Sequence, residues 1–161
     1  AHIHEIILVT GHMADDVAGC VADASIHIVN NPDFSDGMAG SIRTGLAAVG
    51  PDMDAAIVML GDMPGITGGI LDEMIGTYSS QQDALIVAAS ASGRRGNPVL
   101  WDRRFFPELT KLHGDIGARH IISENAHFLM EVEIGDAARI DLDTPEALET
   151  YRSKDQLVKD R

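Results

Sequence analysis

The chain has 161 residues, of which 45% are hydrophobic and 23% charged, so its length and composition predict one globular domain with its own core. Its 12 Lys and Arg against 25 Asp and Glu give a net charge of −13, which argues against general nucleic-acid binding because an acidic surface repels phosphate backbones. One cysteine excludes an internal disulfide and no apolar run approaches a membrane span, so we expect a cytoplasmic protein without a membrane partner.

Short apolar runs alternate with amphipathic stretches along the chain. The apolar runs predict strands at residues 6–9, 26–29, 55–60, 85–89, 98–101 and 128–134. Helical spacing of apolar residues predicts helices near residues 14–21, 40–49, 70–78, 116–122 and 145–151. Continuous apolar strands that alternate with helices are typical of a sheet covered on both faces. We therefore predict an α/β domain with a mostly parallel sheet over residues 1–151, followed by a charged tail over residues 152–161.

An aspartate follows the most apolar of the predicted strands. Asp62 lies between Gly61 and a Met-Pro pair, directly after residues 55–60. Ligands of parallel α/β sheets bind just beyond the carboxyl ends of the strands, and a carboxylate there is suited to Mg²⁺. The alternative interpretation is that Asp62 turns the loop or caps the next helix.

A second acidic segment lies near the end of the chain, at residues 140–145. Strand alternation places Asp141 and Asp143 on the same side, where two carboxylates repel each other unless a cation or hydrogen-bond donors lie between them. The alternative is one helix-capping aspartate and one solvated aspartate.

Two further segments offer anion contacts. In residues 31–43, glycines and Ser41 open a helix, and Arg43 is either a phosphate contact or a charge on the helix surface. Residues 93–98 are the densest basic spot of the chain and predict either a phosphate contact or a hairpin turn with solvated arginines. Arg119, after the loop at 114–118, would likewise reach a ligand or lie on the surface.

Taken in order, these segments resemble the nucleotidyltransferases that attach CMP or GMP to molybdopterin, and most of all the cytidylyltransferase branch. The likeness runs from residue 6 to about residue 151. The matching segments are IILVTGH at 6–12, NPDFSDGMAGSIRTGL at 31–46, VMLGDMPGIT at 58–67, GRRGNPVLWDRRFFPEL at 93–109, LHGDIGAR at 112–119 and IDLDTPEAL at 140–148.

The resemblance implies a nucleotide-diphospho-sugar-transferase fold, which is a three-layer, Rossmann-like sandwich. It implies attack by a phosphate of molybdopterin on the α-phosphate of CTP, with release of pyrophosphate and with Mg²⁺ as cofactor. Asp62 would be the catalytic residue and principal metal ligand, and Asp141 or Asp143 would supply the second carboxylate. The nucleotide would lie along Gly37, Ser41, Arg43 and Gly61. The pterin substrate would face Arg95, Gly96, Asn97, Pro98 and Arg119.

The sequence also departs from the family pattern. The family opens with a strand and a glycine-rich loop that are absent here, so we expect an empty strand position between residues 6–10 and 55–60. Either roughly 40–50 residues precede this sequence or another chain fills that position. Asn97 stands where relatives usually carry histidine. The likeness to the cytidylyltransferase branch favours CTP, whereas the GMAG segment partly resembles the guanylyl branch and keeps GTP as the alternative.

Two other functions remain open from the sequence. A nucleotidyltransferase of the same fold would act on another phosphate or sugar phosphate. A non-catalytic domain would keep the fold and bind a nucleotide or a partner protein. If the chain is instead the molybdopterin cytidylyltransferase, the finished cofactor would pass to a molybdoenzyme.

Overall fold

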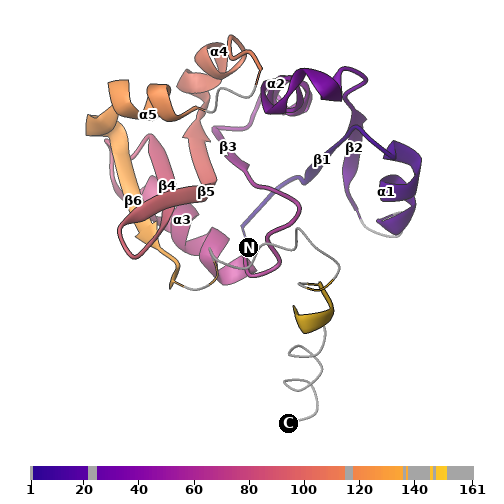
Figure 1. Cartoon of the computed structure of the whole chain (residues 1–161). Coiled ribbons are helices and arrows are strands. Elements are labelled where there is room, and N and C mark those ends of the chain that lie inside the picture. The colour runs from indigo at the N-terminus through magenta and orange to yellow at the C-terminus, as the bar shows by residue number, and fades with distance from the viewer. Residues whose placement is uncertain are drawn as a thin grey trace.

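The computed structural model describes residues 2–21, 25–114, 118–135, 137, 146 and 148–151 (Figure 1). The strands are β1 Ile7–Thr10, β2 His27–Asn30, β3 Ala55–Val58, β4 Ile86–Ala91, β5 Arg94–Asp102 and β6 Leu129–Glu133. The α-helices are α1 Ala14–Cys20, α2 Met38–Ala48, α3 Gly68–Ser80, α4 Phe106–Leu109 and α5 Arg119–Glu124. Short 3₁₀ turns are η1 Phe34–Asp36, η2 Arg103–Phe105 and η3 Ala126–Phe128.

The described strands form a two-stranded sheet and a four-stranded sheet. Strands β1 and β2 pair in parallel, and the larger sheet has the order β3-β5-β4-β6. Both β3 and β4 run antiparallel to β5, and β6 is parallel to β4, so three of these four strands share one direction. Within the described residues no ladder joins β1 to β3, which agrees with the predicted empty strand position between them.

Strand β5 runs against its neighbours, which the expectation of a mostly parallel sheet did not specify. It begins four residues before the predicted run at 98–101 and forms a hairpin with β4. Ser92 and Gly93 make the turn with φ of 52° and 75°, the left-handed conformation that tight hairpins need. The hairpin interpretation of the basic segment is thus confirmed as local structure.

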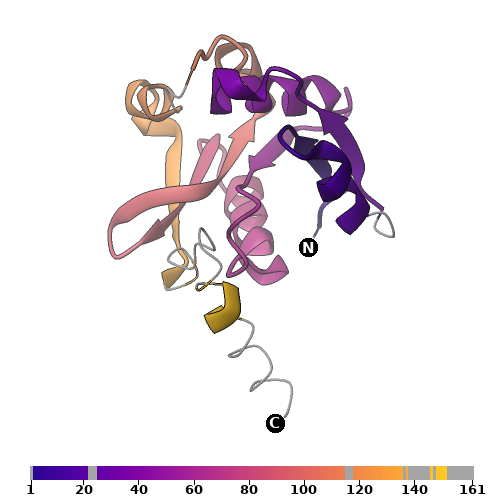
Figure 2. The same ribbon diagram turned by 45° about the vertical axis from the view of Figure 1, so that its right-hand side comes forward.

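Helices cover both faces of the four-stranded sheet (Figures 1 and 2). Alternate residues of β4 divide between two buried clusters, with Ile86 and Ala88 in one and Val87 in the other. Leu46 of α2 and Leu109 of α4 belong to the first cluster, whereas Met74 of α3 belongs to the second. This alternation confirms the prediction, made from the apolar strands, of a sheet between two helical layers.

The segment that follows β5 was not predicted as helical. It forms η2 and α4 and buries Phe105, Phe106 and Leu109 under the sheet. Its aromatic residues lack the spacing of a long amphipathic helix because the segment is only two short turns. The predicted segment 140–145 and the tail 152–161 lie outside the described residues.

Candidate functional site

Asp62 lies in the loop between β3 and α3, beyond the carboxyl end of β3. It does not cap α3, because Thr67 is the N-cap and its hydroxyl oxygen accepts a hydrogen bond from the N–H of Ile70 at 3.5 Å. The Oδ1 atom of Asp62 is buried and has no hydrogen-bond partner among the described residues. The capping alternative is therefore wrong, and the carboxylate is left with an unsatisfied oxygen.

A buried carboxylate oxygen without a partner is energetically unfavourable and is satisfied by a cation or a donor that binds there. The chemistry of Asp62 thus fits a hard divalent metal, which prefers oxygen ligands. The described residues contain no group of three His, Cys, Asp or Glu side chains arranged to hold a metal. Asp141 and Asp143, the predicted further ligands, lie outside the described residues.

The chain that follows those two aspartates returns to the Asp62 loop. Tyr151 donates a hydrogen bond from its hydroxyl to the carbonyl oxygen of Pro64 at 3.3 Å, across 87 positions of sequence. Because Pro64 is two residues from Asp62, this contact brings the end of the described chain to the candidate metal site.

The entry of α2 holds three of the predicted nucleotide contacts. Gly37 is the N-cap and has φ of 98°, a conformation that residues with a side chain rarely adopt. Ser41 is partly exposed in the first turns of the helix, and its Oγ accepts a hydrogen bond from Nδ2 of Asn31 at 3.2 Å. Asn31, the first residue of the matching segment 31–46, is only 3% exposed, and the sequence pattern predicts no role for it.

Arg43 links α2 to another of the predicted segments. Its Nη1 donates to the carbonyl oxygen of Leu112 at 2.5 Å, and the N–H of Ala39 donates to the carbonyl oxygen of Gly114 at 3.2 Å. Arg43 is therefore more than a charge on the helix surface. The structure brings the 37–43 and 112–114 segments together.

The hairpin of β4 and β5 carries most of the predicted pterin contacts. Val58, the last residue of β3, pairs with Val99, so Pro98 lies beside the end of the strand that leads to Asp62. The Asn97–Pro98 peptide is cis, and a side chain at Gly96 would meet no atom within 4 Å.

The two arginines among the predicted pterin contacts are more exposed than Pro98. Nε of Arg95 lies 3.5 Å from a carboxylate oxygen of Glu131, and both side chains are nearly half exposed. Arg119 is the exposed first residue of α5. Gly61, the remaining predicted nucleotide contact, is also exposed and a side chain there would meet no atom within 4 Å. Among the described residues, no hydrogen bond or ion pair joins Asp62 to the α2 entry or to these arginines.

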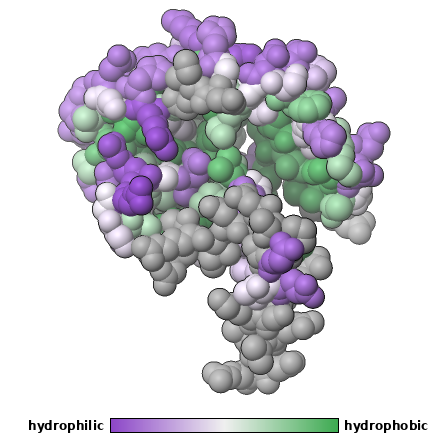
Figure 3. Space-filling view, in the orientation of Figure 1, coloured by the Kyte–Doolittle hydropathy of each residue, from purple (hydrophilic) through white to green (hydrophobic). Residues whose placement is uncertain are grey.

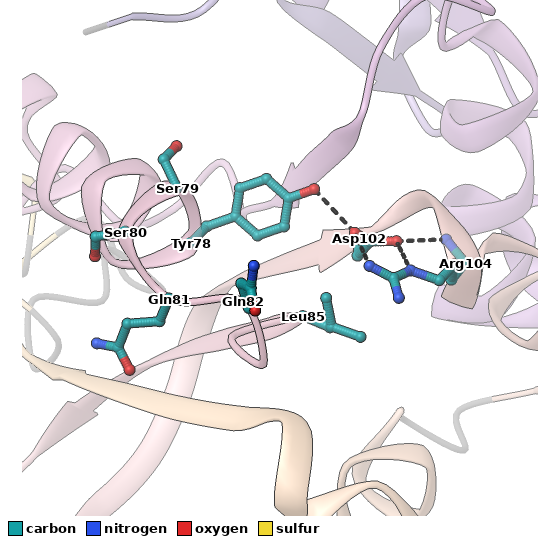
Figure 4. Close-up of a pocket in the computed structure, with 8 residues that line it drawn as sticks. All are labelled: Tyr78, Ser79, Ser80, Gln81, Gln82, Leu85, Asp102 and Arg104. Atoms are coloured by element: carbon teal, nitrogen blue, oxygen red, sulfur yellow. Dashed lines mark hydrogen bonds and ion pairs between the residues drawn. The ribbon is translucent and has the colours of Figure 1, made fainter.

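A polar cavity of about 260 Å³ lies at the end of the larger sheet opposite to Asp62, where β4 begins and β5 ends (Figure 4). Tyr78 donates to Oδ2 of Asp102 at 2.9 Å, and Nε of Arg104 donates to Oδ1 at 3.0 Å. Burial and the neighbouring carboxylate raise the pKa of Tyr78 to about 12. Burial acts to raise the pKa of Asp102, but the hydrogen bonds from Arg104 and Tyr78 outweigh it, so that pKa is lowered. Asp102 and Arg104 lie within the matching segment 93–109, but their contact with Tyr78 spans 24 positions and does not appear in a local sequence pattern.

Hydrophobic surface is visible over α1, β1 and β2 (Figure 3). Large hydrophobic residues that are exposed in these elements or next to them in sequence include Ile6, Met13, Val17, Ile28 and Phe34. Within the described part of the chain, no helix has the length and apolar character needed to cross a bilayer.

The carboxylate beyond β3 lies where enzymes with a layered α/β fold bind their ligands, at the carboxyl end of a strand. Residues 1–128 match the model of the MobA-like NTP transferase domain, so the chain belongs to that family and is a nucleotidyltransferase. Among curated proteins, the molybdenum cofactor cytidylyltransferase of Escherichia coli K12 is 26% identical over 150 residues, covering 92% of this chain and 74% of the relative. The nicotine blue oxidoreductase of Paenarthrobacter nicotinovorans is also 26% identical, over 151 residues, covering 90% of this chain and 74% of the relative.

Solved structures agree with this fold. Rv0371c of Mycobacterium tuberculosis H37Rv, in complex with manganese, has a TM-score of 0.77 and 26% identity, with coverage of 93% of this chain and 78% of that chain. A nucleotidyl transferase from Methanothermobacter, Mth528, has a TM-score of 0.75 over 99% of this chain and 76% of that chain; its identity of 17% supports the fold alone.

Proposed function

We propose that this nucleotidyltransferase transfers CMP, in preference to GMP, from its triphosphate to molybdopterin and releases pyrophosphate. Its similarity to the E. coli cytidylyltransferase supports this choice of nucleotide and acceptor. The oxidoreductase relative has the same identity and is named for different chemistry, so the acceptor is tested separately from the nucleotide.

The observation that carries the proposal is the buried Oδ1 of Asp62, which has no partner among the described residues. Asp62 would hold Mg²⁺ together with Asp141 or Asp143, and the Tyr151–Pro64 hydrogen bond supports that pairing. A bound divalent cation would neutralise the charge that develops on the triphosphate during transfer. The manganese complex of Rv0371c supports a divalent metal in a relative of this chain.

We assign the other predicted residues to the nucleotide or to the acceptor according to where they lie. Gly37 and Ser41 open α2, and we assign them to the nucleotide together with Arg43 and Gly61. We assign the segment from Arg95 to Pro98 near the start of β5, whose first two residues are exposed and whose Pro98 is buried, to the pterin together with Arg119. The exposed guanidinium of Arg95 is suited to a phosphate group because its planar donors match phosphate oxygens.

The metal assignment is tested with Asp62→Ala and a matched control, Asp52→Ala, which removes an exposed carboxylate from the preceding loop. Titration calorimetry with CTP and GTP, each with and without Mg²⁺, is the measurement. We expect Asp62→Ala to abolish the Mg²⁺-dependent part of the affinity while its thermal unfolding stays cooperative, and Asp52→Ala to bind like the wild type. Unchanged Mg²⁺-dependent affinity in Asp62→Ala would remove this residue from the site.

The acceptor is tested by pyrophosphate release. The chain is incubated with Mg-CTP and either molybdopterin or a hexose 1-phosphate. We expect release that depends on molybdopterin. Release only with the sugar phosphate would assign the chain to another acceptor, and nucleotide binding without any release would favour a non-catalytic role.

A further inference from the structure

Asn31 lies directly after β2, where the chain turns toward α2. Its backbone N–H donates to the carbonyl oxygen of Thr10 at 2.8 Å, and the residue is 3% exposed. The side-chain Oδ1 accepts a hydrogen bond from the N–H of Asp33 at 3.2 Å. Because a backbone N–H is only a donor, the atom that it meets is the amide oxygen, so the NH₂ group of Asn31 must face Ser41.

This arrangement determines which hydrogen bonds the Ser41 hydroxyl accepts and which it donates. A serine hydroxyl has one proton to donate and two lone pairs that accept. Nδ2 of Asn31 occupies one lone pair of Oγ at 3.2 Å, which leaves the proton of Ser41 for another acceptor. Among the described residues none accepts a hydrogen bond from this proton, and Ser41 is partly exposed whereas Asn31 is buried.

Gly40 provides the space for this contact. A Cβ at position 40 would lie 3.2 Å from Nδ2 of Asn31 and 3.8 Å from the carbonyl oxygen of Asp33. A side chain there would therefore push the amide away from Ser41 unless the turn shifted. Ser41 thus supplies the hydroxyl, and the missing side chain of Gly40 leaves room for the Asn31 amide that orients it.

We propose that Asn31 is a positioning residue, which makes the hydroxyl of Ser41 a hydrogen-bond donor toward an acceptor atom of the bound nucleotide. This inference rests on the proposed function, in which Ser41 contacts the nucleotide. It adds the direction of that contact and the residue that sets it. Asn31 itself does not touch the ligand.

Asn31→Asp tests the polarity with almost no change in shape. One oxygen of the aspartate still accepts from the N–H of Asp33, but the other can only accept, so Ser41 must turn its proton inward. We expect the affinity for Mg-CTP, measured by titration calorimetry, to fall about tenfold, as is usual when a buried donor contact is lost. Ser35→Asp adds the same charge at an exposed position of the same loop and should leave affinity within about twofold.

A double-mutant cycle separates positioning from a structural effect. In the Ser41→Ala background, Asn31→Asp should change the affinity by less than about twofold, because the hydroxyl through which it acts is gone. An equal loss in both backgrounds would overturn the proposal and assign the effect to charge or to the turn. Unchanged affinity in Ser41→Ala alone would also overturn it and would remove Ser41 from the nucleotide site, without contradicting the transfer reaction itself.

If Asn31→Asp does not fold, which its thermal unfolding would reveal, Gly40→Ala replaces it in the same cycle, since its Cβ meets the same amide. The loss should again vanish in the Ser41→Ala background. A wild-type chain that binds neither Mg-CTP nor Mg-GTP would contradict the proposed function itself, and with it this inference.

Discussion

The hydroxyl of Tyr78 donates a 2.9 Å hydrogen bond to the carboxylate of Asp102, so the last turns of α3 are tied to the end of β5. Asp102 is 7% exposed and its other oxygen accepts from the backbone and side chain of Arg104. The network thus anchors α3 to the larger sheet on the face away from α4, far from the carboxylate that we assign to the metal.

Tyr78→Phe should destabilise the chain by about 2 kcal/mol, because it removes a hydrogen bond to a charged, buried acceptor. Tyr151→Phe is the matched control: its hydroxyl donates to the neutral carbonyl of Pro64 at 3.3 Å, and its loss should be less than about 1 kcal/mol. Urea unfolding at pH 7 measures both. Equal losses would show that the charge of Asp102 does not strengthen the bond.

The pH dependence of stability should show the same network. Because folding raises the pKa of Tyr78 from 10.0 to about 12, its contribution is complete below pH 10 and is lost as pH rises toward 12. Folding lowers the pKa of Asp102, so its contribution is present above the ordinary carboxyl range and is lost as pH falls below it. Urea unfolding between pH 9 and 12 should show an alkaline loss that is smaller in Tyr78→Phe. The same slope in both proteins would contradict the assignment.

Arg103→Lys should lower stability by about 2 kcal/mol. The guanidinium donates to the carbonyl oxygens of Met53, at 2.5 Å, and Gly50, and it lies 5.1 Å from the ring centre of Phe106. A lysine has no planar fork with which to serve two carbonyls and a ring at once. Arg94→Lys, at the exposed hairpin turn, should change stability by less than about 0.5 kcal/mol. Similar effects of both substitutions in urea unfolding would show that any cation suffices at position 103.

Alanine substitutions at two helical glycines should change the free energy of unfolding by different amounts. At Gly76, on the exposed side of α3, a Cβ meets nothing within 4 Å, so Gly76→Ala should stabilise the chain by about 0.5–1 kcal/mol. At Gly40 the same helical gain is opposed by the contact with Asn31, and we expect no net stabilisation from Gly40→Ala. Equal gains in urea unfolding would mean that the Asn31 amide moves aside freely.

The strands could be predicted because they read as short apolar runs, and the run is unbroken where the strand is buried on both faces, as in residues 86–89 of β4. The reversal of β5 could not, because Pro98 to Trp101 gives the same apolar signal in either direction. Direction is fixed instead by the turn at Ser92 and Gly93, whose basic neighbours also fitted a phosphate loop.

The sequence predicts Asp62 as a candidate because it follows an apolar strand. Only the structure shows that Thr67, and not Asp62, caps α3. The Asn31–Ser41 contact spans ten positions and the Tyr78–Asp102 contact 24, so neither falls within one element of secondary structure. Such contacts depend on how elements pack, which local sequence patterns do not encode.

Helix α2 packs against both the two-stranded and the four-stranded sheet. Ala39 and Leu46 are buried in the cluster on the larger sheet, while a Cβ on Gly45 would come within 3.1 Å of Val9 in β1. With no ladder between β1 and β3 in the described residues, this helix is a principal mechanical connection of the pair β1–β2 to the rest of the molecule. Amide hydrogen exchange in β1 and β2 should therefore accelerate whenever α2 is loosened, even by substitutions whose side chains face only the larger sheet.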